Sequence, residues 1–226
     1  MYKLYIANKN YSSWSLRAWL LMRELSFPFE EEIFPFTENS WEEYKKRCPG
    51  GLVPWLKDGD KEVWDSFAIA EYLAESHARV WPEDTSARAW ARSVAAEMHS
   101  GFPALRMQCP MSCGVRIALT EISAPLQKDI SRINELWLEG LNRFGGPFLA
   151  GEKFTALDAF FAPVVFRIRT YDLPMEDKCS EYAEHLLSIG SMREWEEAAL
   201  KETWREPEHE SDMIKYGVLV EDLRIT

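Results

Sequence analysis

The pattern of hydrophobic and polar positions differs between the two parts of the chain. In the first 78 residues, short alternating or apolar runs predict β-strands, and stretches with helical spacing lie between them. The predicted strands are 3–6, 29–33, 52–57 and 62–64. The predicted helices are 13–25, 40–47 and one that begins at Ser66. The order is therefore βαβαββα, and we expect an α/β domain over residues 1–78.

From Thr85 onward the only periodicity is that of helices. One apolar stripe repeats at i, i+4 and i+7 spacing and runs through Leu126, Ile130, Ile133, Trp137, Leu141 and Phe144. Further helices are predicted at 155–170, 177–188 and 190–201. We therefore expect residues 79–84 to be a linker and residues 85–226 to form an all-helical domain. The tail is charged, but Val218, Leu219 and Val220 predict a short segment that packs back onto the body.

Two turn signals interrupt the strand-like region. Asp58-Gly59-Asp60 separates two predicted strands and is typical of a β-hairpin. Pro54 falls inside a strand-like run, where a proline removes a hydrogen-bond donor from the sheet. Either this strand lies at an edge, or the bond before Pro54 is cis and exposes the main-chain groups of Val53 to a peptide-like ligand.

Composition and charge narrow the classes of function. The chain has 226 residues, is 46% hydrophobic and carries a formal net charge of −11, with a pI near 5.0. A surface this acidic repels phosphate backbones and anionic lipids, so we expect neither nucleic acid nor a membrane as a partner. No apolar run is long enough to span a bilayer, and the N-terminal residues read as a strand rather than a signal peptide. We therefore expect a cytoplasmic protein.

The metal-binding and redox residues form no recognisable motif. The cysteines, at 48, 109, 113 and 179, contain no CxxC pair, and a cytoplasmic protein keeps its thiols reduced, so we expect structural thiols. A redox role is the alternative for Cys109 and Cys113, which are four residues apart and can share a helix face. The four histidines, at 77, 99, 185 and 209, lack the spacing of metal ligands. The sequence also lacks a P-loop and the GxGxxG and GxSxG motifs. We therefore expect no metal ion.

Polar residues at the starts of two predicted helices are the first candidates for chemistry. Ser12, Ser13 and Ser15 begin the first helix, where they either cap it or stabilise a thiolate beside the helix dipole. Asp65 and Ser66 begin the third helix, where they either cap it or bind a carboxylate and an ammonium group.

Other polar residues have mainly structural interpretations. Arg17 is expected to face solvent or to pair with a carboxylate. Thr155 and Asp158 match a capping box for a buried helix.

Further residues at i, i+4 and i+8 of one predicted helix are expected to line a cleft that faces the first domain. These are Met98, Phe102 and Arg106.

Taken together, these segments resemble the cytosolic glutathione transferases. The resemblance rests on Ser12-Ser13-Trp14-Ser15-Leu16-Arg17, Val53-Pro54, Asp65-Ser66 and Thr155-Ala156-Leu157-Asp158, and covers roughly residues 3–200. It is closest to bacterial members with a serine motif, near the zeta class, which includes maleylacetoacetate isomerase. The zeta motif usually has a cysteine where this chain has Trp14.

The resemblance implies a fold, a ligand and a set of site residues. The fold would be a thioredoxin-like N-terminal domain followed by an all-helical domain, assembled as a homodimer. Glutathione would be the co-substrate, and no metal would be needed. Ser12 or Ser13 would stabilise the thiolate, with Tyr5 as the alternative hydroxyl. The other implied glutathione-binding residues are Trp14, Ser15, Asn39, Val53, Pro54, Asp65 and Ser66.

The implied activity is glutathione transfer to an electrophilic small molecule. The second substrate would lie against Met98, Phe102 and Arg106 in the cleft between the domains, with Arg106 orienting an anionic group. Three alternatives remain open. They are isomerisation of a cis-enone acid, reduction of disulfides or peroxides with glutathione, and binding without turnover.

Overall fold

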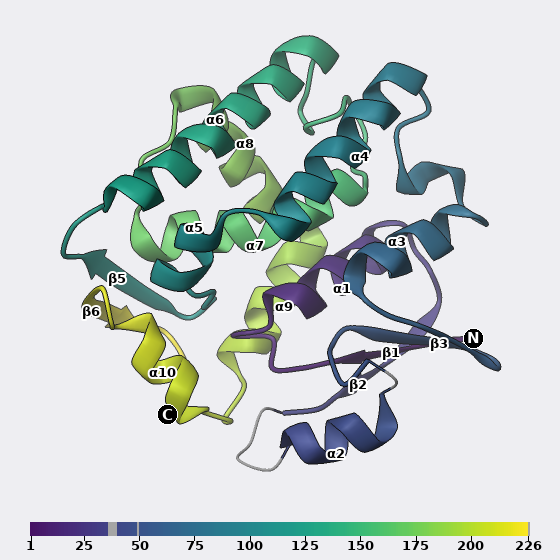
Figure 1. The fold of residues 1–226 in the computed structure, drawn as a ribbon, viewed down its shortest axis with the longest axis horizontal. Helices are drawn as coiled ribbons and strands as arrows, with labels where there is room; N and C mark the ends of the chain where they lie inside the picture. The colour runs from purple at the N-terminus through teal and green to yellow at the C-terminus, as the bar shows by residue number, and fades with distance from the viewer. Residues whose placement is uncertain (36–39, 49, 226) are drawn as a thin grey trace.

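The computed structural model describes residues 1–35, 40–48 and 50–225. Asn39, implied to meet the glycine end of glutathione, lies outside the described residues. Figure 1 shows a small sheet flanked by helices at one end of the molecule and a larger group of helices at the other. The thioredoxin-like and helical fold class expected from the sequence is confirmed.

The N-terminal sheet has the strand order β2-β1-β3-β4. Its strands are β1 (Tyr2–Ile6), β2 (Phe29–Ile33), β3 (Trp55–Asp58) and β4 (Lys61–Val63). β1 runs parallel to β2 and antiparallel to β3, and β3 and β4 form the predicted hairpin around Gly59. Gly59 has a φ of +62°, which a glycine adopts without steric cost.

Three helices cover the two faces of this sheet. They are α1 (Ser13–Glu24), α2 (Ser40–Arg47) and α3 (Ser66–Ala74). Figure 1 shows α1 and α3 on one face and α2 on the other. Successive side chains of a strand point to opposite faces, so Leu4 joins the main core with α1, whereas Tyr5 packs against Trp55 and Tyr44 on the α2 side.

The rest of the chain is mainly helical. It begins with the short 3₁₀ helix η1 (Ala78–Val80). The α-helices are α4 (Thr85–Ser100), α5 (Pro103–Gln108), α6 (Ala124–Phe144), α7 (Ala156–Tyr171), α8 (Asp177–Ser188), α9 (Gly190–Leu200) and α10 (Pro207–Met213). α7 is buried on nearly every side and packs against α1, which joins the two halves of the molecule. No helix among the described residues is both long and apolar enough to cross a bilayer.

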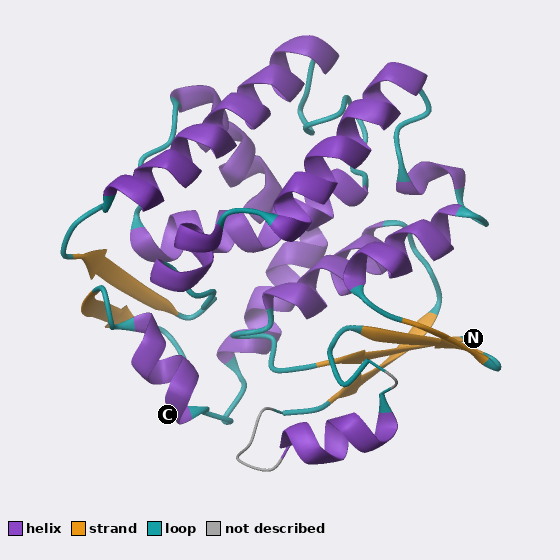
Figure 2. Cartoon of the chain, viewed as in Figure 1, coloured by secondary structure: helices purple, strands orange, loops and turns teal. Residues whose placement is uncertain are grey.

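The helical part also contains two strands that its periodicity did not predict. β5 (Val115–Leu119) pairs antiparallel with β6 (Gly217–Asp222) in a separate two-stranded sheet, seen as the second group of strands in Figure 2. The segment expected at 218–220 belongs to β6 and returns to the body by pairing with β5, but the side chains of Val218, Leu219 and Val220 stay exposed rather than packing against it. β5 is only five residues long and its partner lies about 100 residues away, so no local repeat marks it.

One predicted strand begins later than expected. The 52–57 run was predicted as a strand, but β3 starts at Trp55, so Pro54 lies just before the strand rather than inside it. The Val53–Pro54 bond is cis, which confirms one of the two interpretations of this proline.

Candidate active site

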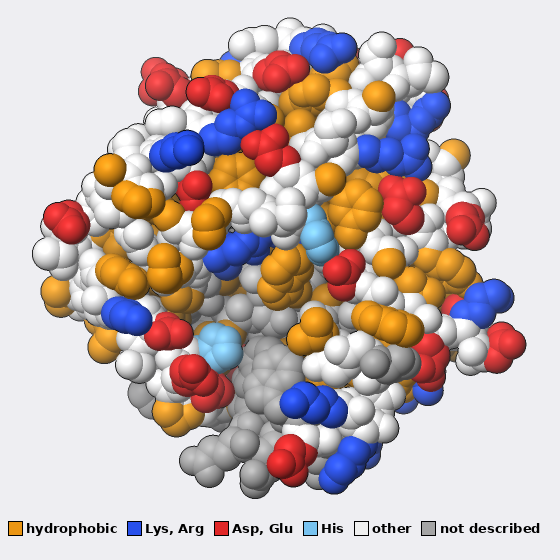
Figure 3. Space-filling view, viewed as in Figure 1, with side chains coloured by type: hydrophobic (Ala, Val, Ile, Leu, Met, Phe, Trp, Pro, Cys, Tyr) orange, Lys and Arg blue, Asp and Glu red, His pale blue; other side chains and the backbone are white. Residues whose placement is uncertain are grey.

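A cleft of about 470 Å³ opens between the start of α1 and the helical part. Its walls come from the start of α1, the loop before β3, α5, α7 and the α10 region. Of the predicted site residues, Ser12, Ser13, Trp14, Val53 and Arg106 line it. Figure 3 shows basic and hydrophobic side chains together around the hollow in the middle of this face.

The first serine of the motif is held by its own helix. Ser12 is the N-cap of α1, and its oxygen accepts a hydrogen bond from the Ser15 N–H at 3.3 Å. Its hydroxyl donates to the Ser15 hydroxyl at 2.7 Å. The Ser15 oxygen in turn accepts from the Ala7 N–H at 3.1 Å, which ties the helix to the end of β1. Ser15 is fully buried and does not line the cleft.

The second serine has a different environment. Ser13 lies in the first turn of α1 and lines the cleft. Its side chain makes no hydrogen bond with another described residue, whereas that of Ser12 makes two. A free hydroxyl beside the N-terminus of a helix is well placed to donate a hydrogen bond to an anion.

Val53 presents its main chain to the same cleft. It lies in the loop between Gly51 and β3, and neither its N–H nor its C=O is hydrogen-bonded within the described part of the chain. A peptide-like ligand could therefore pair with these two groups as an additional strand would. Pro54, which follows the cis bond, does not itself line the cleft.

Two arginines form the opposite wall. Arg106 donates from Nε to the Gly101 carbonyl at 2.9 Å, and a second nitrogen donates to the Met98 carbonyl. Arg167 is buried and donates to the carbonyls of Cys109 at 2.8 Å and Pro163 at 3.1 Å. Burial lowers the pKa of both, that of Arg167 to about 10. Their printed hydrogen bonds all go to main-chain carbonyls and neither forms an ion pair with a described carboxylate, so the cleft has an excess of positive charge on this side.

Asp65 and Ser66 do not line the cleft; they lie at the start of α3, where Asp65 contacts His99 of α4. The Asp65 carboxylate caps α3 by accepting from Phe67 N–H at 2.9 Å, and its other oxygen lies 3.1 Å from His99 Nε2. The Ser66 hydroxyl is buried and has no partner among the described residues. The capping interpretation of Asp65 is therefore confirmed.

Both parts of the chain match models of one known protein family. The model of the glutathione S-transferase N-terminal domain matches residues 11–76, and that of the C-terminal domain matches residues 116–199. Together they cover more than half of the chain. The chain belongs to the glutathione S-transferase family.

Individual relatives of this family member are distant. A glutathione S-transferase-like protein, OpS6, of Beauveria bassiana is 26% identical over 203 residues, 85% of this chain and 90% of that protein. A zeta-class glutathione S-transferase of Euphorbia esula is 26% identical over 166 residues, 72% and 74% of the two chains. A Burkholderia glutathione transferase homologue with bound glutathione superposes with a TM-score of 0.67 at 22% identity, covering 88% of this chain and 97% of that chain. This last likeness shows the shared fold.

Some predicted residues of this glutathione S-transferase family member lie away from the cleft. Met98 and Phe102 are buried in the core. The expected single helix is also wrong, since α4 ends at Ser100 and α5 starts anew at Pro103, so the i, i+4 and i+8 spacing does not place the three residues on one helix face. The residue before a proline is disfavoured in the helical region, and Phe102 takes a left-handed conformation with φ of 60°. Of this predicted trio only Arg106 lines the cleft. Tyr5, the alternative hydroxyl, stacks on Trp55 with ring centroids 4.2 Å apart and is not part of the cleft wall.

Arg17 also differs from its expected environment. It is 1% exposed, and none of its three guanidinium nitrogens has a hydrogen-bond partner in the described structure. Its guanidinium carbon lies 4.4 Å from the ring centroid of Trp14 and 5.0 Å from that of Phe160. It therefore neither faces solvent nor pairs with a carboxylate, as the sequence had suggested.

The tail supplies cleft residues that sequence reasoning did not find. His209, Asp212 and Lys215 line the cleft from the α10 region, and Arg167 does so from α7. An arginine in the otherwise apolar run that follows Asp158 was the available signal for Arg167. The tail residues lie roughly 200 positions from the serine motif, so only the folded chain brings them there.

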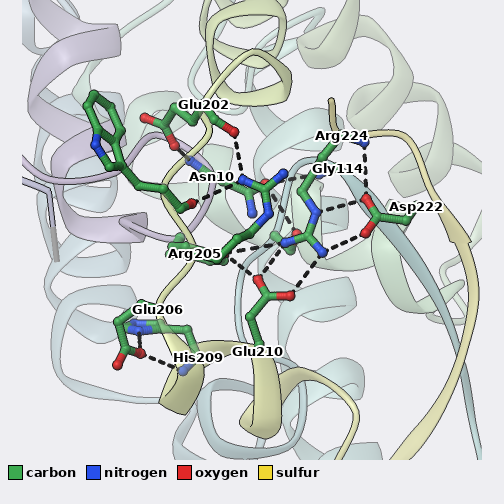
Figure 4. A network of polar contacts seen from close by, with 12 residues as sticks. Asn10, Gly114, Glu202, Arg205, Glu206, His209, Glu210, Asp222 and Arg224 are labelled. Carbon is green, nitrogen blue, oxygen red and sulfur yellow. Dashed lines mark hydrogen bonds and ion pairs between the residues drawn. The ribbon is translucent and has the colours of Figure 1, made fainter. Parts of the chain in front are cut away.

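A network of polar contacts holds the tail in place (Figure 4). The Glu202 carboxylate accepts from the main-chain N–H groups of Lys9 at 2.6 Å and Asn10 at 3.1 Å. Arg224 binds Asp222 at 2.7 Å and Glu210 at 2.9 Å, and Tyr11 donates to Glu210. These contacts fix α10 against the loop that precedes α1.

The described residues contain no group of three or more His, Cys, Asp or Glu side chains that could hold a metal ion. The four cysteines are buried and unpaired, as the sequence predicted. Burial raises the pKa of Cys109 to about 12 and that of Cys179 to about 11, so these thiols are protonated near neutral pH. None of the four lines the cleft.

Proposed function

We propose that the chain is a glutathione transferase that converts the glutathione thiol to a thiolate for attack on an electrophilic small molecule. The observation that carries this proposal is the free hydroxyl of Ser13 at the start of α1, inside the cleft. The N-terminus of a helix favours an anion, and thiol pKa values fall in such positions. A hydroxyl that donates to the sulfur adds to this effect.

Glutathione would lie extended along the loop before β3. The main-chain groups of Val53 would pair with its cysteinyl residue, and the Ser66 hydroxyl would accept or donate a hydrogen bond at its γ-glutamyl end. In this orientation the sulfur would lie beside Ser13. Ser12 would support the site indirectly, because its hydroxyl is engaged with Ser15.

The reaction then needs only the thiolate and a positioned electrophile. The thiol proton leaves to solvent, and the sulfur forms a bond to the electrophilic carbon. The electron pair passes to a leaving group or to a conjugated oxygen. Arg106 and Arg167 would orient an acidic substrate and stabilise the negative charge that develops on it.

The same two arginines favour a second candidate, the isomerisation of a cis-enone acid. The substrate of that reaction carries a carboxylate, which matches the excess of positive charge on this wall of the cleft. Addition of the thiolate would convert the carbon–carbon double bond of the substrate to a single bond, and the substrate would rotate about this bond. Elimination of the thiolate would then restore both the alkene and the free thiol.

Calorimetric titration of glutathione, followed by ultraviolet difference spectra across pH, tests the proposal. We expect binding and a thiolate absorbance that appears well below the pKa of free glutathione. Binding without thiolate would instead support a carrier or a disulfide reductase, and no binding would reject the transferase. Release of product from an electrophile separates conjugation from isomerisation. We also propose a homodimer, which sedimentation of the same protein would test.

A further inference from the structure

Arg17 combines complete burial with the lack of any polar partner. It is 1% exposed, and its Nε, Nη1 and Nη2 atoms are all buried and unbonded within the described structure. Transferring a charged group out of water is costly unless it is paired and hydrogen-bonded. An apolar side chain of similar length would fill the same space without that cost. The charge therefore lowers the stability of the unliganded protein, and a folding role does not explain it.

The position of Arg17 directs its charge toward the serine motif. It lies four residues after Ser13, one turn along the same face of α1. Long side chains on a helix lean toward its N-terminus, and the guanidinium of Arg17 accordingly reaches Trp14 in the first turn of α1. It stacks on Trp14 at 4.4 Å, and Trp14 lines the cleft beside Ser13.

The surroundings of Arg17 do not cancel its charge. The charged and titratable groups around it come from α3, α4, α5 and α7 and are Asp65, His99, Arg106 and Arg167. Of these, Asp65 is engaged by the α3 N-terminus and by His99. Arg106 lies 4.9 Å from the same Trp14 ring. Burial and then the charges of Arg106 and Arg167 lower the pKa of Arg17, so an anion nearby would be favoured.

Phe160 closes the other side of the guanidinium at 5.0 Å. Two aromatic rings, rather than water, therefore surround the charge, and its field is screened less than that of a surface arginine. Trp14 both contacts this guanidinium and lines the cleft.

We propose that Arg17 is a positioning residue for the thiol chemistry, whose buried and unpaired charge acts past Trp14 to favour a thiolate at Ser13. This inference rests on the proposed function, because it concerns the thiol bound in that cleft. Arg17 would not touch the ligand. The bound thiolate would compensate the charge that the unliganded protein leaves unpaired.

The test compares two neutral variants, Arg17→Met and Arg17→Gln, with wild type and with Arg23→Met. Arg23 lies on the same helix but is exposed and pairs with Glu194 at 2.6 Å, away from the cleft. For each protein, glutathione is added to saturation and the thiolate absorbance is titrated with pH. Glutathione affinity at a pH where the thiol is neutral and the melting temperature without ligand are measured in parallel.

We expect both neutral variants to melt no lower than wild type without ligand and to bind neutral glutathione within about threefold of it. Their bound thiol should titrate about one pKa unit higher, which is about tenfold less thiolate at a pH well below both pKa values. Arg23→Met should match wild type. An unchanged thiol pKa in either folded neutral variant overturns the inference while leaving the transferase proposal standing. An ordinary thiol pKa in wild type overturns both.

Discussion

The hydroxyl of Ser12 donates a 2.7 Å hydrogen bond to the hydroxyl of Ser15. This contact separates the roles of two adjacent serines that the sequence could not tell apart. Ser12 caps α1 and is bonded within it, whereas Ser13 in the next position faces the cleft with a free hydroxyl. The two should therefore respond differently to the same substitution.

We expect Ser13→Ala to raise the pKa of bound glutathione, because the sulfur loses a hydrogen-bond donor, with little change in affinity for the neutral thiol. Ser12→Ala should instead lower the free energy of unfolding by about 1 kcal/mol, the usual cost of an N-cap, with a smaller effect on the thiol. Ultraviolet titration and urea unfolding measure the two effects. The reverse pattern would assign the thiol to Ser12.

Arg106 and Arg167, which form one wall of the cleft, predict a preference for acidic electrophiles. Arg167→Met should raise KM for a substrate with a carboxylate about 10- to 100-fold, since a hydrogen bond to a charged group contributes about 1.5–3 kcal/mol. A neutral electrophile should be affected far less, because it makes no such bond. Steady-state kinetics with a matched acid and its ester check this, and Arg193→Met on the exposed side of α9 is the control. Equal losses for acid and ester would place the anion elsewhere.

The buried capping box should dominate the stability of the helical part. The Asp158 carboxylate accepts from the N–H groups of Leu149 at 3.0 Å and Thr155 at 2.9 Å, and from the Tyr182 hydroxyl at 3.2 Å. Asp158→Ala leaves these donors buried without a partner, so we expect a loss of about 3–4 kcal/mol. Chemical denaturation measures it, with the exposed Asp177→Ala as control, for which less than about 0.5 kcal/mol is expected.

The same carboxylate gives a pH dependence of known sign. Burial raises the pKa of Asp158 to about 6, above the usual value of 3.8. An acid whose pKa is higher in the folded state binds its proton more tightly there. Its contribution to stability is therefore full below pH 3.8 and is lost as pH rises to about 6, by about 3 kcal/mol. The difference in unfolding free energy between wild type and Asp158→Asn should change over this range, and a flat difference would contradict the prediction.

Loosening the C-terminal tail should weaken binding of the electrophilic substrate more than binding of glutathione. Arg224 joins β6 to α10 through Asp222 and Glu210, and α10 carries His209 and Asp212 to the cleft. We expect Arg224→Met to increase hydrogen exchange in α10 and β6 and to raise KM for the electrophile, while glutathione affinity changes little. Hydrogen exchange with mass spectrometry checks the first effect. Unchanged protection of α10 would show that the Glu202 contacts are sufficient.

Much of the fold could be predicted from the sequence because it depends on local signals. The alternation that places Leu4 in the core and Tyr5 on the opposite face, and the turn at Gly59, are properties of neighbouring residues. The capping box at Thr155 and Asp158 needs only four positions. β5 and β6 could not be predicted in the same way, since each strand is stabilised by a partner about 100 residues away.

The candidate site likewise divides into features set by local sequence and features set by contacts between distant segments. The sequence by itself determined where α1 begins, that a cis bond before Pro54 was one of two options, and that polar residues cluster at helix starts, because capping and turn geometry are local. Only the tertiary structure decided that Ser13 rather than Ser15 faces the cleft, that Arg167 and Lys215 join it, and that Arg17 is buried without a partner. These outcomes depend on which distant surfaces cover each side chain, and burial of that kind is a property of the packed chain alone.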